Sequence, residues 1–82
     1  MVRLRERRFN AATAALGAGT EQARARLIGV DERTVRRARA GTIGEVFIAS
    51  VLLKFQEHAT ELAEIGMKPT FEEFFEVAVA DA

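Results

Sequence analysis

The sequence predicts an all-helical fold, a small bundle of about five helices in a single domain over residues 1–82, for three reasons. Helix-favouring Ala, Leu, Arg and Glu are common, and Pro occurs only once. Apolar residues recur at helical spacing along most of the chain. Glycines fall at the breaks between these periodic stretches. A domain of 82 residues buries only about 60–65% of its unfolded surface, so a partner copy would help to stabilise it.

The first predicted helix covers residues 1–16. Phe9, Ala12 and Leu16 fall on one face of it at i, i+3 and i+7, with Leu4 roughly in line. Its N-terminal part is rich in Arg, whose positive charges oppose the helix dipole. This end of the helix is therefore expected to fray in isolation.

Two short helices joined by a tight turn are predicted over residues 20–41. Thr20 can cap the first helix with its hydroxyl. Gly29 follows the last apolar position of that helix, where a left-handed backbone is easiest for a residue without a Cβ. Asp31 then caps the second helix, residues 31–39.

The contact between these two helices needs a small side chain on one and an apolar side chain on the other. Ala25 and Val35 meet this requirement at the right spacing. Val35 and Ala38 should face inward on the second helix. The outer surface of that helix and its flanks are left with a row of guanidinium groups, from Arg33, Arg36, Arg37 and Arg39.

Residues 45–65 carry the strongest core pattern in the chain. The apolar stripe follows i, i+1, i+4, i+5, i+8 spacing and consists of Phe47, Ile48, Val51, Leu52 and Phe55. We expect this helix to be the floor on which the others pack. Whether it runs unbroken to Ile65 or bends near His58 to Thr60 is left open by the sequence.

A last helix is predicted after the connector at Pro69. Thr70 and Glu73 have the spacing of a capping box at its start. Three phenylalanines share one face of this short helix, either as ordinary core or as a contact with a second copy or partner: Phe71, Phe74 and Phe75. Residues 67–82 are therefore a candidate extension for dimerisation or partner binding.

The formal net charge is zero, yet the charges are segregated along the chain. Residues 1–41 carry ten Arg against four acidic residues, which leaves a charge of +6. Residues 42–82 carry two Lys against eight acidic residues, which leaves −6. The basic half has the character needed to bind phosphates, and the acidic half either faces a partner or simply solvates helix surfaces.

Residues 20–41 resemble the helix-turn-helix of phage repressor and Cro-type (XRE-like) regulators, whose pattern is roughly T-x-x-x-L-A-x-x-x-G-V-S-x-x-T-[IV]-S-x-x-x-x-G. Asp31 replaces the usual capping Ser, Arg24 stands where the family usually has Leu, and Arg36 stands where it often has Ser. The positions that match the pattern are Thr20, Ala25, Gly29, Val30, Thr34, Val35 and Gly41.

The resemblance implies a sequence-specific double-stranded DNA-binding protein, a small phage or prophage-type transcriptional regulator whose second motif helix enters the major groove. It implies base contacts from Glu32, Arg33 and Arg36, since such side chains can reach guanine O6/N7 or a cytosine amino group. Phosphate contacts are expected nearby and from the basic N-terminus, namely from Arg3, Arg5, Arg7, Arg8, Thr20, Thr34, Arg37 and Arg39. The N-terminal arginines could equally be a solvated terminus.

One recognition helix spans only a few base pairs, so we expect a homodimer on a near-palindromic site. Two other functions remain open. The chain could be an interaction module that holds a protein partner with its acidic C-terminal half, residues 57–81. It could also be an architectural protein that binds DNA without sequence preference.

Catalysis is not expected. The chain has no Cys and one His, His58, so a metal site, a metal cofactor or a thiol nucleophile is not indicated. No Gly-rich phosphate loop and no nucleophile with a paired base is visible. There is no signal-peptide pattern and no apolar run near eighteen residues, so we expect a cytoplasmic, nucleoid-associated protein without cofactor or membrane contact.

Overall fold

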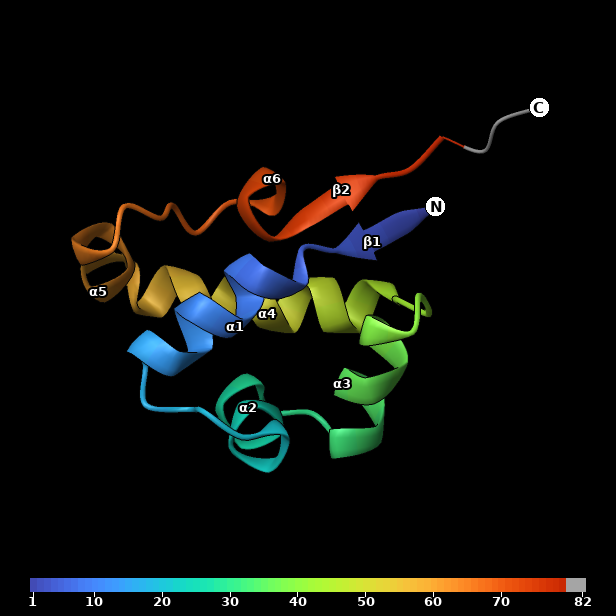
Figure 1. Cartoon of the computed structure of the whole chain (residues 1–82), viewed down its shortest axis with the longest axis horizontal. Helices are drawn as coiled ribbons and strands as arrows, with labels where there is room; N and C mark the ends of the chain where they lie inside the picture. Colours follow the sequence, from blue (N-terminus) through green and yellow to red (C-terminus); the bar gives the residue numbers. More distant parts are fainter. Residues whose placement is uncertain (80–82) are drawn as a thin grey trace.

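The computed structural model describes residues 1–79, and these form a mostly helical domain with a small two-stranded sheet (Figure 1). The helical prediction is thus confirmed, but the fold is not purely helical. In chain order the elements are β1 (Val2–Leu4), α1 (Glu6–Ala15), α2 (Glu21–Ile28), α3 (Glu32–Arg39), α4 (Glu45–Glu57), α5 (Ala59–Glu64), α6 (Phe71–Phe74) and β2 (Phe75–Val77). None of the helices over residues 1–79 has both the length and the apolar character required to cross a membrane.

Helix α4 is the floor of the core, as its apolar stripe predicts. Phe47, Val51 and Phe55 are buried along one side of it. The Phe9 ring of α1 lies 6.2 Å from the rings of both Phe47 and Phe55. The α6 ring of Phe74 meets Phe55 edge-on, with 4.5 Å between the ring centres. Figure 1 shows α4 lengthwise with α6 and the sheet above it, α2 and α3 below it, and α1 overlapping it in this view.

The first helix begins at Glu6, so its predicted start at residue 1 is wrong. Residues Val2–Leu4 form β1, which pairs antiparallel with β2 through the partners Val2↔Val77, Arg3↔Glu76 and Leu4↔Phe75. The Leu4 side chain is buried and reaches the core from the strand. The strand partner lies more than 70 residues away, and helical periodicity within a local window cannot reveal it.

The predicted length of the C-terminal helix is also wrong, because only its first turn is helical. Helix α6 ends at Phe74, and the chain continues as the strand β2. Thr70 occupies the N-cap position, but its hydroxyl makes no capping hydrogen bond. Glu73 accepts instead from the backbone N–H of Lys68, 3.0 Å away. The expected capping box is therefore absent, and β-branched Val77 enters a strand.

The three phenylalanines of this segment belong to the core of the chain itself. Phe74 and Phe75 are fully buried, and half-buried Phe71 stacks on Phe75 at 5.3 Å. Of the two roles considered for them, core packing is the one observed. A dimer contact through Phe74 or Phe75 is excluded for the folded chain because neither ring reaches the surface.

The helix over residues 45–65 does not run unbroken to Ile65 but is broken at His58. His58 has φ −114° and ψ 30°, and it separates α4 from α5. Its ring Nδ1 lies 2.9 Å from Glu61 Oε2 on the surface. The bend lets Leu62 of α5 turn back into the core, where it is fully buried.

Candidate nucleic-acid interface

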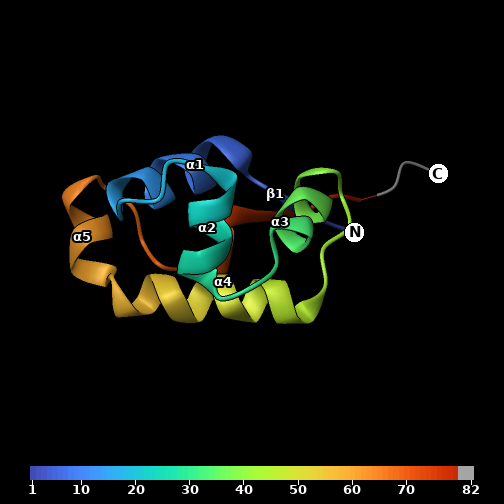
Figure 2. The same ribbon diagram turned by 90° about the horizontal axis from the view of Figure 1, so that it is seen from below.

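Helices α2 and α3 are joined by a short turn whose geometry follows from its sequence. The Thr20 hydroxyl caps α2 by accepting from the Ala23 N–H at 3.1 Å. Gly29 adopts a left-handed backbone with φ 85°, and the N–H groups of Gly29 and Val30 both donate to the Ala25 carbonyl, at 2.8 and 3.0 Å. Asp31 stands at the N-cap of α3 without a side-chain capping bond. Figure 2 shows α2 and α3 side by side, both above α4 in that view.

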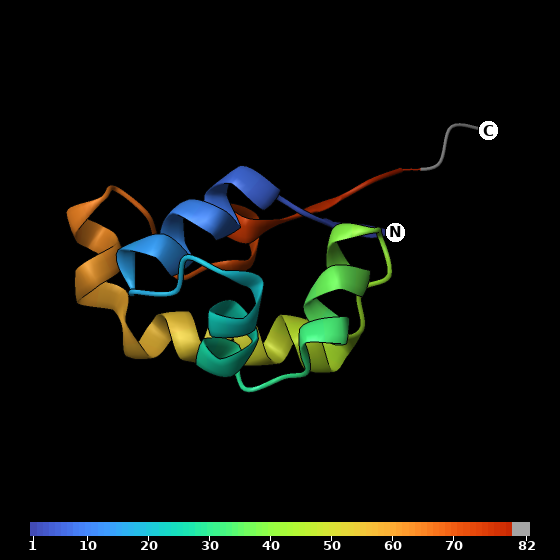
Figure 3. The same cartoon turned by 60° about the horizontal axis from the view of Figure 1, so that its bottom comes forward.

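The two faces of α3 differ sharply in polarity. Val35 and Ala38 are buried, as predicted, and Ala25 of α2 is buried too. The opposite face is exposed and carries Glu32, Arg33, Arg36 and Arg37. We call these four side chains the α3 outer face. Figure 3 shows α3 at the margin of the molecule, where no other element covers it.

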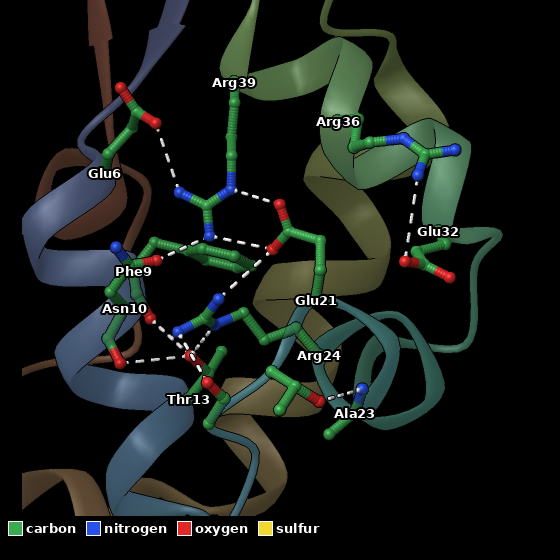
Figure 4. A network of polar contacts seen from close by, with 12 residues as sticks. Glu6, Phe9, Asn10, Thr13, Glu21, Ala23, Arg24, Glu32, Arg36 and Arg39 are labelled. Atoms are coloured by element: carbon green, nitrogen blue, oxygen red, sulfur yellow. Dashed lines mark hydrogen bonds and ion pairs between the residues drawn. The ribbon is translucent and has the colours of Figure 1, made fainter.

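Only one ion pair involves the α3 outer face in the part of the chain that the structure describes. Arg36 Nη1 lies 3.8 Å from Glu32 Oε1, one helical turn away, and both side chains are largely exposed (Figure 4). Such an exposed pair contributes little to stability and can open readily. Arg33 and Arg37 make no ion pair with residues 1–79. The outer face therefore has guanidinium groups available for a ligand.

Arg39 does not belong to this outer face, although it lies on the same helix. Its Nε donates to Glu21 Oε2 at 2.7 Å, and its Nη1 and Nη2 donate to Glu6 Oε1 at 3.1 Å and Asn10 Oδ1 at 2.6 Å (Figure 4). The guanidinium also lies 5.7 Å from the centre of the Phe9 ring. We call this cluster of Arg39, Glu21, Glu6 and Asn10 the Arg39 brace. It ties α3 to both α1 and α2.

The charges of the brace stabilise one another. The hydrogen bond from Arg39 lowers the pKa of the Glu21 carboxyl, although burial acts in the opposite direction. Burial disfavours the charged Arg39 guanidinium, but the hydrogen bonds to Glu21 and Glu6 outweigh it and raise its pKa. Both groups are therefore ionised near neutral pH. The inward direction of the Arg39 side chain could have been inferred from the sequence, because Arg39 follows the inward-facing Val35 by four residues.

Arg24 has a second structural role. Its Nε donates to the Thr13 hydroxyl at 3.1 Å, and its Nη1 lies 3.2 Å from Glu21 Oε1. Thr13 is fully buried, and its hydroxyl also donates to the Phe9 carbonyl at 3.0 Å. The polar Arg24 is thus matched by a polar contact on α1. This explains how Arg is accommodated where the helix-turn-helix pattern usually has Leu.

The four N-terminal arginines divide into two pairs. Arg8 Nη1 lies 2.7 Å from Glu73 Oε2, and Arg5 donates to the Phe75 carbonyl at 3.2 Å and faces Glu76 at 3.8 Å. These two arginines hold the C-terminal segment onto β1 and α1. The other two, Arg3 and Arg7, are exposed and make no ion pair within residues 1–79.

The remaining predicted contact residues are Arg3, Thr20 and Thr34. Arg3 lines an open hollow together with Gly41 and Thr42, just beyond the end of α3. The Thr20 hydroxyl is already engaged as the cap of α2, and Thr34 is half-buried on α3. Around α3, Arg3, Arg33 and Arg37 therefore make no ion pair within residues 1–79, and Arg36 has only its exposed 3.8 Å pair with Glu32.

No family model, curated protein or solved structure significantly matches this chain. Function has to be inferred from the geometry and charge of the chain itself. Residues 1–79 contain no group of three or more His, Cys, Asp or Glu side chains arranged to bind a metal ion. The α3 outer face is the surface with the most distinctive chemistry.

Proposed function

We propose that this protein binds double-stranded DNA sequence-specifically, as a small transcriptional regulator of the phage or prophage type. In this proposal α2, the turn at Gly29 and α3 form a helix-turn-helix unit, and α3 enters the major groove. The observation that carries the proposal is the polarity of α3. It buries Val35 and Ala38 against the domain, whereas Arg33, Arg36 and Arg37 are exposed on the other side.

The side chains of the α3 outer face have the chemistry that base recognition requires. Arg33 and Arg36 can each donate two hydrogen bonds to guanine O6 and N7, and Glu32 can accept from a cytosine amino group. Each good bidentate contact contributes about 1–3 kcal/mol of discrimination against the wrong base. The 3.8 Å pair between Arg36 and Glu32 is long and exposed, so opening it to reach a base costs little.

Arg37 and Arg3 are suited to the phosphates that flank the groove. Arg37 lies on the α3 outer face, and Arg3 lies beside the end of α3. Arg5, Arg8 and Arg39 are less suited, because each is already paired within the chain. The Arg39 brace serves the function indirectly, since it holds α3 at a set angle to the rest of the domain.

A homodimer on a near-palindromic site completes the proposal. One α3 can read only a few base pairs, and half-sites about one helical turn apart would be read by two copies. Regulation would then follow from the protein concentration and from dimerisation.

The test is selection of bound duplexes from a random-sequence library, followed by anisotropy titrations of the selected and scrambled duplexes. We expect an enriched inverted repeat that is bound about a thousandfold more tightly than the scramble. Arg33→Glu should weaken binding to the selected site at least tenfold, because it removes a base contact and adds repulsion. Lys68→Glu is the matched control, since it makes the same charge change on an exposed residue away from α3.

Three outcomes would contradict the proposal. Equal weakening by Arg33→Glu and Lys68→Glu would show that only the net charge matters. Binding that depends steeply on salt but not on sequence would indicate an architectural protein instead. Absence of binding near physiological salt would favour the acidic half as the active surface, although Glu73 and Glu76 there are already paired with Arg8 and Arg5.

A further inference from the structure

Among the elements within residues 1–79, none covers the outer side of helix α4. Val46 and Leu53 lie there and are 76% and 64% exposed, whereas Phe47 and Phe55 are buried on the opposite side. Because Val46 and Leu53 are two helical turns apart, their side chains point the same way. Figure 2 shows α4 along one margin of the molecule, with both of its ends leading back to the same side. A second helix can therefore lie along the outer side of α4.

The outer side of α4 is uncharged and has small residues at its middle. Exposed Ala49 and half-buried Ser50 lie between Val46 and Leu53, and residues 46–53 include no charged side chain. Small side chains let a second helix approach closely, and larger ones on either side of them fill the contact. Single exposed apolar side chains are common on protein surfaces, but here two of them share one helix face. We call Val46, Ala49, Ser50 and Leu53 the α4 seam.

The order of residues along the α4 seam is self-complementary. Two copies of α4 can pack antiparallel about a two-fold axis that passes between residues 49 and 50. Each residue then faces the one that lies equally far from the axis in the other direction. Val46 faces Leu53 of the second copy, and Ala49 faces Ser50 of the second copy. Large apolar side chains therefore meet one another, and small ones meet where the helices cross.

The charges beside the α4 seam match the same pairing. Glu45 and Lys54 are equally far from the axis and lie on opposite flanks of the helix, at about 100° per residue. The two-fold rotation therefore brings Lys54 of one copy to Glu45 of the other. Glu45 makes no ion pair with residues 1–79, and Lys54 pairs only with exposed Glu57, at 3.0 Å. A surface pair of this kind is easily exchanged for another.

We propose that the α4 seam packs antiparallel against the α4 seam of a second copy of this chain. The occupant is a second copy because the apolar, small and charged positions all find their complements within the same stretch of sequence. The contact is short, so the dissociation constant is on the order of 100 µM, and the chain is largely monomeric at a few micromolar. The inference rests on the proposed function only in its expectation of a homodimer, and it uses none of the proposed DNA-contacting residues.

The first experiment is sedimentation equilibrium of the full chain without DNA, at low ionic strength and up to about 1 mM protein. The wild type should show a monomer–dimer equilibrium. Leu53→Glu should associate at least about tenfold more weakly, because it places a carboxylate against apolar Val46 of the second copy. Its circular dichroism spectrum should be unchanged, since Leu53 is exposed in the single chain.

A charge exchange tests the pairing itself. Glu45→Lys should weaken association about fivefold, because Lys then faces Lys54 at both ends of the contact. Adding Lys54→Glu to the same chain should restore wild-type association, because opposite charges then face each other again. Glu64→Lys makes the same charge change on an exposed residue of α5 and should leave association unchanged. Circular dichroism checks that each variant is folded.

Cross-linking tests the position of the axis. The chain has no Cys, so a single introduced Cys can form a disulfide only with its copy in the dimer. Ala49→Cys, beside the axis, should give a disulfide-linked dimer at least about tenfold faster than Ala63→Cys, because a disulfide needs Cα atoms within about 7 Å. Ala63 is the matched control, since it is also an exposed Ala but lies on α5.

Three outcomes would overturn the inference. They are a wild type that stays monomeric, a dimer that Leu53→Glu leaves intact, and a charge exchange or a cross-link that behaves like its control. The proposed function is tested separately. A chain that stays monomeric yet binds the selected duplex contradicts this inference alone, whereas an intact α4 dimer that binds no DNA contradicts the proposed function alone.

Discussion

At the scale of the residue, arginines that look alike in the sequence have different roles set by the direction in which each side chain points. Arg37 faces solvent on α3, whereas Arg39, two residues later, faces α1 and α2 and pairs with Glu21. Arg24 likewise meets buried Thr13.

Arg39→Met should destabilise the fold by about 1–3 kcal/mol, because it removes hydrogen bonds between charged groups and leaves partly buried Glu21 with Arg24 alone. Arg37→Met is the matched control on the same helix and should change stability by less than about 0.5 kcal/mol. Urea unfolding measures both. Equal losses for the two variants would show that the brace does not stabilise the fold.

Glu21 should make the stability depend on acidity. Its pKa is lowered in the folded chain, chiefly by the hydrogen bond from Arg39. The stabilisation is therefore present above the unfolded value of about 4.3 and is lost as the pH falls from there through the folded pKa. Glu21→Gln should lose less stability than the wild type between pH 7 and pH 3 in urea titrations. Glu72→Gln, an exposed control, should follow the wild type.

At the scale of the element, short turns and caps were predictable, whereas the formation of strands by the terminal segments was not. Thr20 and Gly29 act locally, through a hydroxyl that meets a nearby N–H and through a missing Cβ. The segments around Leu4 and Phe75 contain the same apolar residues that a helix would use, and only their pairing with each other makes them strands.

Gly29→Ala should destabilise the protein by about 1–2 kcal/mol, because an L-residue with a Cβ disfavours φ 85°. An added Cβ would meet no atom within 4 Å, so the cost comes from the backbone alone. Gly19→Ala is the control, since it has equal space and no left-handed φ. It should be neutral or stabilise by up to about 1 kcal/mol in thermal unfolding. A harmless Gly29→Ala would mean that the turn between α2 and α3 tolerates another shape.

At the scale of the whole molecule, the two ends of the chain close the fold on each other. Strands β1 and β2 pair, and the ion pairs Arg8–Glu73 and Arg5–Glu76 join the basic half to the acidic half. The charge segregation along the sequence is thus partly neutralised in space. Arg33 and Arg37 on α3 and Arg3 beside its end make no ion pair within residues 1–79, which is why the α3 outer face is the strongest candidate for binding a polyanion.

Phe75→Ala should destabilise the whole domain by about 3–5 kcal/mol, because it empties a buried site between Phe47 and Phe71. In so small a domain this should appear as one cooperative loss of helix signal in circular dichroism. Leu53→Ala, on the exposed side of α4, should stay within about 0.5 kcal/mol of the wild type. A folded, stable Phe75→Ala would contradict the core position of this ring.

The sequence by itself determined the features that depend on neighbours a few residues apart. It predicted the helical class, the core stripe of α4, the cap at Thr20, the left-handed Gly29 and the inward Val35 and Ala38, because helical spacing and backbone preference are local properties. It also predicted that Arg33, Arg36 and Arg37 lie on the exposed side of α3, although it placed Arg39 there with them.

The tertiary structure alone decided which distant segments meet. It made strands of Val2–Leu4 and Phe75–Val77 and placed Phe74 and Phe75 in the core. It also directed Arg39 away from the outer face of α3 and into its hydrogen bonds with Glu21. These outcomes depend on partners as many as 75 residues apart, as for Val2 and Val77. Their pairing energy arises only when the whole chain folds, and no local pattern of residues encodes it.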